Sequence, residues 1–289
     1  MKGAIIYSTT NAASLNIMRH LEKDWNWKKK SERHYSFSTC AKENCCSSVM
    51  AYGLDKEIVA IEPGDADAAR RADAHGKADS AVADYFLYAS THKSAEGKPA
   101  LTAHIPGNWA KNEMGGEERT LNMAYACKLK QILQLLAEGN KKHGLNWPVN
   151  MEVDHHGPTP NDGKGKLIFV EIGSKAEEWE NELAGKVVAE AMMKALFREA
   201  PIVPVYLGFG GGHYTPKFTP LMIGWDEAVG HVLPKYQAEN FDAAMLKQAI
   251  GKTHEKVEGA LVDWKGLPGG HRERIIELIE HEGIKWRKI

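Results

Sequence analysis

Short apolar runs alternate along this chain with stretches of helical periodicity, and this alternation constrains the fold more than any other feature. Several runs are apolar at every position, as is typical of central strands that helices cover on both faces. The sequence therefore predicts an α/β fold. The predicted strands are Gly3–Tyr7, Glu57–Ile61, Asp84–Ala89, Leu101–His104, Asn150–Val153, Leu167–Ile172 and Ile202–Leu207.

Three helices are predicted between and after these strands. The first starts at Glu118, carries leucines at three- and four-residue spacing, and ends near Gly139. The second starts after Ser174, because Glu177 follows three residues later as in a capping box. The third is Arg272–Glu282, which closes the chain.

The 289 residues contain no internal repeat and no long Pro/Gly/Ser linker, so one domain with loop elaborations is predicted over 1–289. The longest apolar runs are far too short to span a bilayer, and the N-terminus lacks the long apolar region of a signal peptide. Four cysteines in a chain of this size do not form a disulfide framework and fit a reducing compartment. We therefore expect a cytoplasmic monomer with no membrane partner and no obligate protein partner.

The balance of charge limits how this chain could bind RNA. With 37 basic and 38 acidic residues the net charge is −1, so a local basic patch would have to hold an RNA partner. Two segments, Trp25–Lys30 and Lys285–Lys288, interleave aromatic and basic residues. Such segments could stack on nucleic acid and neutralise it, or could be plain solvated surface.

The placement of the thirteen histidines carries most of the functional information. Five of them lie at or just after the ends of predicted strands, where open α/β sheets bind their ligands, so we expect them to converge. The remaining histidines that stand alone are expected to be structural. The five are His92, His104, His155, His156 and His213.

Acidic residues accompany these histidines, namely Glu152, Asp154 and Glu171. Imidazoles with carboxylates nearby could hold a zinc ion that polarises an ester carbonyl and activates water. Glu152 and Asp154 could equally be a solvated strand edge. Neighbours on a strand point to opposite faces, so we expect one of His155 and His156 to face the site and the other to be packed away.

A glycine run, Gly208–Gly212, follows the last predicted strand. It lacks the spacing of dinucleotide-binding and P-loop motifs. We expect Gly210, Gly211 and Gly212 to offer backbone N–H groups to a ligand, with His213 held above it; a tight turn is the alternative.

Several motifs occur in order along nearly the whole chain and together resemble the archaeal and plant type of D-aminoacyl-tRNA deacylase. They are Ala89-Ser-x-His92, Leu101-Thr-x-His104-x-Pro-Gly-Asn108, His155-His-Gly-Pro-Thr159, Glu171-Ile-Gly-Ser174 with Glu178-Trp179, Gly208-Phe-Gly-Gly-Gly-His-Tyr214 and Asp263-Trp-Lys-Gly-Leu267. The sequence departs from the pattern at Asp154, where threonine is expected, and in the Gly/Lys-rich loop Asn161–Lys166.

The resemblance implies a three-layer α/β/α fold with a mixed, largely parallel sheet, similar to peptidyl-tRNA hydrolase. It implies hydrolysis of the ester of D-aminoacyl-tRNA in translation quality control, zinc as cofactor, and removal of aldehyde-modified D-aminoacyl-tRNA. The alternatives are a zinc-assisted hydrolase or phosphorylase acting on a small nucleoside or peptide, and an RNA-binding module with structural histidines.

The expected mechanism is attack by an activated water, since the chain has no GxSxG nucleophile motif. The expected catalytic residues are His92, His104, His155, His156, Glu171 and His213. The expected metal ligands are His92, His104, His155 and His156. The expected substrate-binding residues are Ser90, Asn108, Gly210, Gly211, Gly212 and Tyr214.

Overall fold

The structure, a computed structural model, is built around two β-sheets. It describes residues 3–8, 10–25, 28–31, 34–38, 48–54, 84–112, 115–157, 159 and 165–289. In that part of the chain the main sheet has eight strands. Their spatial order is β2 (Lys28–Ser31), β3 (His34–Ser38), β4 (Ser48–Leu54), β1 (Gly3–Ser8), β5 (Tyr85–Lys93), β10 (Lys166–Ser174), β6 (Ala100–His104) and β9 (Val149–Met151).

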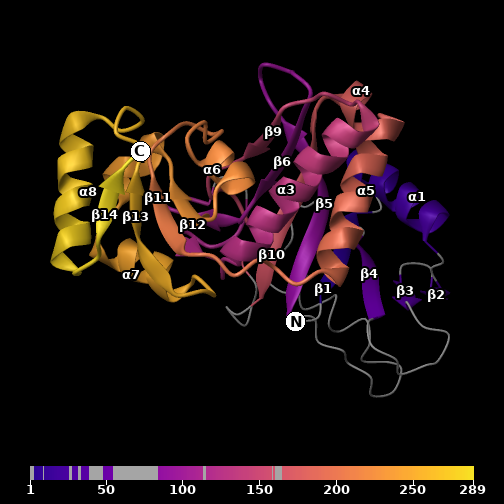
Figure 1. Ribbon diagram of the computed structural model, residues 1–289, viewed down its shortest axis with the longest axis horizontal. Coiled ribbons are helices and arrows are strands. Elements are labelled where there is room, and N and C mark those ends of the chain that lie inside the picture. The colour runs from indigo at the N-terminus through magenta and orange to yellow at the C-terminus, as the bar shows by residue number, and fades with distance from the viewer. Residues whose placement is uncertain are drawn as a thin grey trace.

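The main sheet is mixed and mostly parallel at its centre. Strand β1 pairs in parallel with β4 and β5, β5 pairs in parallel with β10, and β6 pairs in parallel with β9. Strand β6 runs antiparallel to β10, and β3 is antiparallel to both of its neighbours. The helices α1 (Ala12–Asp24), α3 (Ala126–His143) and α5 (Glu182–Phe197) pack beside one another against this sheet (Figure 1).

The second sheet has four strands, all parallel, in the order β12 (Ala228–Leu233), β11 (Val205–Phe209), β13 (Val257–Val262) and β14 (Trp286–Lys288). It lies at the C-terminal end of the molecule (Figure 1). Helices α3 and α6 (Phe218–Gly224) contact its β12 strand. Its other face packs on α7 (Ala243–Gly251) and α8 (Gly269–His281) in a separate hydrophobic core. The predicted α/β class, a mixed and mostly parallel sheet with helices on both sides, is confirmed.

The remaining elements are short. A two-stranded ribbon pairs β7 (Gly107–Asn108) with β8 (Thr120–Leu121). The helix α4 (Ala176–Trp179) precedes α5, and the 3-10 helix η2 (Lys235–Asn240) follows β12. No helix in the described part of the chain is long and apolar enough to cross a membrane.

All three predicted helices have other bounds than expected, and the last one, predicted over Arg272–Glu282, is α8 over Gly269–His281. The helix predicted from Glu118 begins only at Ala126, because Arg119 has a left-handed φ of 49° and the chain first forms β8. The helix predicted after Ser174 is divided into α4 and α5, since Asn181 has an extended backbone and its side chain caps α5. The side chain of Glu178, rather than Glu177, accepts a hydrogen bond from the backbone of Lys175.

The predicted strands differ from the observed ones in both halves of the chain, and β2, β3 and β4 in the first half were not predicted. The strand predicted over Ile202–Leu207 starts at Val205, since Ile202 is fully exposed and Pro204 has no N–H to donate. Strands β12, β13 and β14 were not predicted, so the existence of a second sheet was not expected from the sequence. The predicted strand Glu57–Ile61 lies outside the described residues.

Candidate active site

One side of the site is formed by side chains on one face of three adjacent strands, where side chains alternate between the two faces of the sheet. On β5, β10 and β6, every second residue packs into the core beneath the helices, as Leu87, Ile168 and Leu101 do. The residues between them point to the opposite face of the sheet. The strand register aligns two rows on that face, Tyr88–Phe169–His104 and Ser90–Glu171–Thr102.

His92 ends the same alternation on β5 and lies opposite Gly173. A Cβ at Gly173 would come within 2.6 Å of the His92 ring, so this position has to be glycine for the imidazole to fit. The ring places Nδ1 2.9 Å from Oε1 of Glu152 and 3.7 Å from Oε2 of Glu171. Its Nε2 lies 2.6 Å from the hydroxyl of Tyr214. Burial alone would lower the pKa of His92, but its hydrogen bonds to the two glutamates raise it to about 11.

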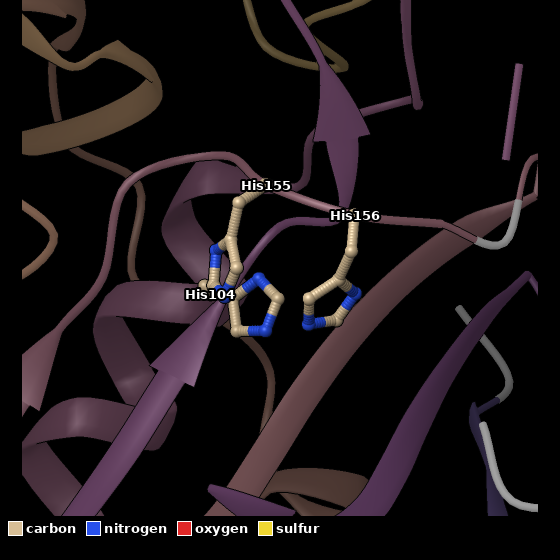
Figure 2. A group of neighbouring side chains, drawn as sticks. All are labelled: His104, His155 and His156. Carbon is tan, nitrogen blue, oxygen red and sulfur yellow. The ribbon is translucent and has the colours of Figure 1, made fainter. Parts of the chain in front are cut away.

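Three further histidines form a compact group of imidazoles. His104 comes from the end of β6, whereas His155 and His156 come from the segment after β9, and their rings are turned toward one another (Figure 2). The ring centroid of His104 is 4.1 Å from that of His155 and 4.9 Å from that of His156. The two consecutive rings are 4.3 Å apart.

A backbone carbonyl fixes the tautomer of each of these three rings. The Nδ1 atoms of His104, His155 and His156 lie 3.2, 2.8 and 2.9 Å from the carbonyl oxygens of Ile105, Val153 and Gly157. A carbonyl oxygen can only accept, so each Nδ1 carries the proton and each Nε2 keeps its lone pair.

Two of these imidazoles, His104 and His155, are held in an environment that favours their neutral form. Burial, reinforced by the neighbouring His156, lowers the pKa of His104 to about 3. Burial and the neighbouring His104 lower the pKa of His155 well below its usual value. Neutral imidazoles with free Nε2 atoms are the form that binds metal ions.

The consecutive histidines face the site together, which corrects the expectation that one of them would be packed away. His156 has a left-handed φ of 43°, so the chain does not continue as an extended strand and the strand alternation ends there. The turn is anchored where the N–H of Gly107 donates to the carbonyl of His156 over 2.8 Å.

The two acidic residues of this segment are fully buried and are not a solvated strand edge. Oε2 of Glu152 lies 3.3 Å from Nε2 of His155 and 3.2 Å from Nε2 of His213, in addition to the contact with His92. Burial alone would raise the pKa of Glu152, but the hydrogen bonds of His213 and His92 hold it well below its usual range. Glu152 is therefore an ionised carboxylate at the centre of the histidines.

Asp154 has a different partner, His231 of β12. The Nδ1 of His231 lies 2.7 Å from Oδ2 of Asp154, and the N–H of Val232 donates to Oδ1 over 3.2 Å. Asp154, the position at which the sequence departs from the family pattern, thus joins the loop after β9 to the second sheet. His231 was given no role from the sequence. The available signal was a histidine inside an apolar strand, which needs a buried polar partner.

Glu171 lies on the same face of the sheet, between His92 and the group of imidazoles formed by His104, His155 and His156. Its Oε2 accepts a hydrogen bond from Oγ1 of Thr102 over 3.2 Å and lies 4.0 Å from Nε2 of His104. Burial, with the nearby Glu152 acting in the same direction, raises the pKa of this carboxyl above its usual value. From here on, "the histidine cluster" denotes His92, His104, His155, His156 and His213 together with Glu152 and Glu171.

Donor atoms in the histidine cluster are close enough to hold a metal ion. Ligand atoms lie within 4.8 Å of one another in the groups His104–His155–His156, His92–Glu152–His213 and His104–Glu152–Glu171. Three of the four predicted ligands therefore share one group, and His92 belongs to a neighbouring one.

The first group has the features of a zinc site. Its donor set of three imidazoles is typical of catalytic zinc, and each ring donates its other N–H to a carbonyl, as metal-bound histidines do. Moreover, Nε2 of His104 is buried without a hydrogen-bond partner in the described part of the chain. The residues present fit Zn²⁺.

Two of the predicted substrate-binding side chains lie in or beside the histidine cluster. Ser90 is buried beside Glu171 on the same face of the sheet, and Tyr214 contacts His92. The side-chain amide of Asn108 donates hydrogen bonds to the carbonyls of Gly115 and Glu117.

The glycine run is a tight turn whose first two N–H groups are already used, contrary to expectation. Gly210 and Gly211 have φ values of 109° and 89°, which L side chains rarely adopt. The N–H of Gly210 donates to Leu233, and that of Gly211 donates to Gly266. The turn therefore fixes the position of His213 and does not offer these two donors to a ligand. Gly212 lies between this turn and His213.

Comparisons with known proteins agree with one another. A family model described as D-aminoacyl-tRNA deacylase matches residues 79–287. The D-aminoacyl-tRNA deacylase of Pyrococcus furiosus is 38% identical over 205 residues, which cover 71% of this chain and 73% of that protein. The protein of the same name from Methanocaldococcus jannaschii is 30% identical over 301 residues and covers 100% of both chains.

A solved structure has the same fold over nearly the whole chain. It is the crystal structure of a conserved protein of unknown function, AF0625, with a TM-score of 0.81 and 25% sequence identity. The match covers 99% of this chain and 95% of that one.

Proposed function

The chain belongs to the D-aminoacyl-tRNA deacylase family, and from this membership we propose that the histidine cluster hydrolyses the ester bond of D-aminoacyl-tRNA. The observation that carries the proposal is the group of three imidazoles whose Nδ1 atoms face backbone carbonyls and whose ligand atoms lie within 4.8 Å of one another, next to two buried carboxylates. The products are free tRNA and a free D-amino acid.

His104, His155 and His156 would hold Zn²⁺, which supplies a Lewis acid that polarises the ester carbonyl and activates water. In the reaction a water oxygen bonds to the carbonyl carbon, and the bond between that carbon and the ribose oxygen breaks. We assign Glu171 as the group that takes the proton from the water and returns it to the ribose oxygen, since its carboxylate lies beside His104.

The remaining members of the histidine cluster orient the reacting groups. Glu152 stays ionised and orients the rings of His92 and His213. His92 in turn is in contact with the hydroxyl of Tyr214. We assign to Tyr214 and His213 the contact with the aminoacyl end of the substrate, because both follow β11 at the exposed side of the cluster.

The biological setting follows from the substrate. We propose that the protein acts as a monomer in the cytoplasm and removes D-amino acids from tRNA as part of translation quality control. We extend the proposal to D-aminoacyl-tRNA whose amino group carries an aldehyde adduct, because the ester bond to be cleaved is the same. A free aminoacyl ester without the tRNA is expected to be a poor substrate.

Removal of zinc is expected to abolish deacylation. The purified protein is dialysed against a chelator, its metal content is measured, and Zn²⁺ or Mg²⁺ is then added back. Zinc should restore activity, whereas magnesium should not, since Mg²⁺ prefers oxygen ligands. Full turnover by protein free of metal would exclude zinc from the chemistry.

A further inference from the structure

The carboxyl ends of the four parallel strands of the second sheet lie along one edge, where basic and aromatic residues follow β12 and β13 and a lysine ends β14. With strands about 4.8 Å apart, this edge is roughly 14 Å long. We call it the cationic edge. Its residues are Lys235 and Tyr236 after β12, Trp264 and Lys265 after β13, Lys288 at the end of β14, and Arg272 of α8.

The cationic edge is continuous with the histidine cluster. The N–H of Val153 donates to the carbonyl of His213, which brings the loop after β11 against the cluster. The same loop is hydrogen-bonded to the segments after β12 and after β13. The N–H of Lys235 donates to the carbonyl of Gly211, and the N–H of Gly211 donates to the carbonyl of Gly266.

One end of the edge carries a packed group of cations and aromatic rings. The guanidinium of Arg272 lies 4.0 Å from the ring centroid of Trp264, and Nζ of Lys288 lies 4.9 Å from it. The ring of Trp286 is stacked on Trp264 at 6.4 Å with an angle of 11°. These contacts hold two positive charges over a rigid aromatic surface.

The other end of the edge carries Tyr236, which is 49% exposed. Burial of its hydroxyl, together with the charges of Glu152 and Asp154, raises the pKa of Tyr236 to about 12. Lys235 and Lys265 are exposed as well. The carboxylate of Asp263 is buried, and it accepts a hydrogen bond from the N–H of Gly266 over 3.0 Å.

Positive charges next to aromatic rings, here the exposed Tyr236 and the half-buried Trp264, are the chemistry that binds single-stranded nucleic acid, through phosphates and stacked bases. The chain as a whole has a net charge of −1, so this local concentration is what could attract RNA. We propose that the cationic edge binds the 3′-terminal, single-stranded end of the tRNA and delivers its ester to the histidine cluster. This inference rests on the proposed function.

The test replaces three exposed lysines of the edge in one variant, Lys235→Gln with Lys265→Gln and Lys288→Gln. The matched control makes the same change at three other exposed lysines: Lys256 and Lys285, which directly precede β13 and β14, and Lys247 on α7. Binding of uncharged tRNA is measured between about 50 and 200 mM salt. The edge variant should bind about 10-fold or more weakly, with a salt slope smaller by about 2–3, and the control should match the unaltered protein.

A second pair of variants tests base stacking. Tyr236→Ala should raise KM for D-aminoacyl-tRNA by about 5-fold to 100-fold, because stacking of one base is lost, whereas Tyr236→Phe keeps the ring and should stay close to the unaltered KM. Unchanged tRNA affinity and salt slope in the triple variant would overturn the inference, as would a protein that binds no tRNA. A protein that binds tRNA through this edge and does not deacylate it would overturn the proposed function alone.

Discussion

Replacing His104 with alanine is expected to lower kcat/KM on D-aminoacyl-tRNA by roughly 10³-fold, because a metal-held Lewis acid supplies several kcal/mol of transition-state stabilisation. His104 is fully buried, and its Nε2 has no hydrogen-bond partner in the described residues, so its ring is available as a ligand. Zinc content should fall together with activity. The measurement is steady-state deacylation with parallel elemental analysis.

The matched control is His281→Ala, since His281 lies on α8 with its side chain 85% exposed. This variant should keep the activity and the zinc of the unaltered protein. A folded His104→Ala protein with unchanged turnover would remove the three-imidazole group from the mechanism.

Glu171→Gln is expected to lower kcat by roughly 10²–10⁴-fold, because the amide keeps the shape of the side chain but cannot accept the proton of the attacking water. The hydrogen bond from Thr102 can be kept, so the fold should be preserved. Single-turnover deacylation, with thermal melting as the folding check, measures the effect. Glu138→Gln on the exposed side of α3 is the control, and a Glu171→Gln protein with full kcat would show that another group accepts the proton.

Part of the site could be predicted from the sequence. Strand alternation puts Glu171 on one face, and His92 lies at the carboxyl end of β5 as expected. The same rule does not account for His104, because β6 runs antiparallel to β10 and His104 lies opposite Phe169, four residues before Gly173. The expected convergence of the five histidines is observed, but it depends on a strand order that local pattern does not give.

The partners of the buried acids could not be predicted, because they depend on contacts between distant segments. Asp154 meets His231 across 77 positions of sequence, and Glu152 meets His213 from a turn on the other sheet. Backbone conformation was equally hidden. A residue other than glycine that adopts the left-handed conformation, as His156 does, cannot be recognised from the sequence. The glycine run, in turn, is compatible both with a loop that binds a ligand and with a tight turn.

The second sheet was missed for a related reason. Its strands β12 and β13 are short and contain Gly230 and Gly259, which weaken the strand pattern. Burial against α3, α7 and α8 stabilises these strands in the folded protein. This stabilisation comes from tertiary contacts, which the strand propensities of the local sequence do not reveal.

The most direct test of the account is the deacylation of D-tyrosyl-tRNA and L-tyrosyl-tRNA by the zinc-loaded protein under identical single-turnover conditions, repeated with D- and L-aspartyl-tRNA. We expect the D-aminoacyl ester to be cleaved far faster than the L form for both amino acids. Equal rates on the two enantiomers, or no cleavage of either, would contradict the assignment of this histidine cluster as a D-aminoacyl-tRNA deacylase site.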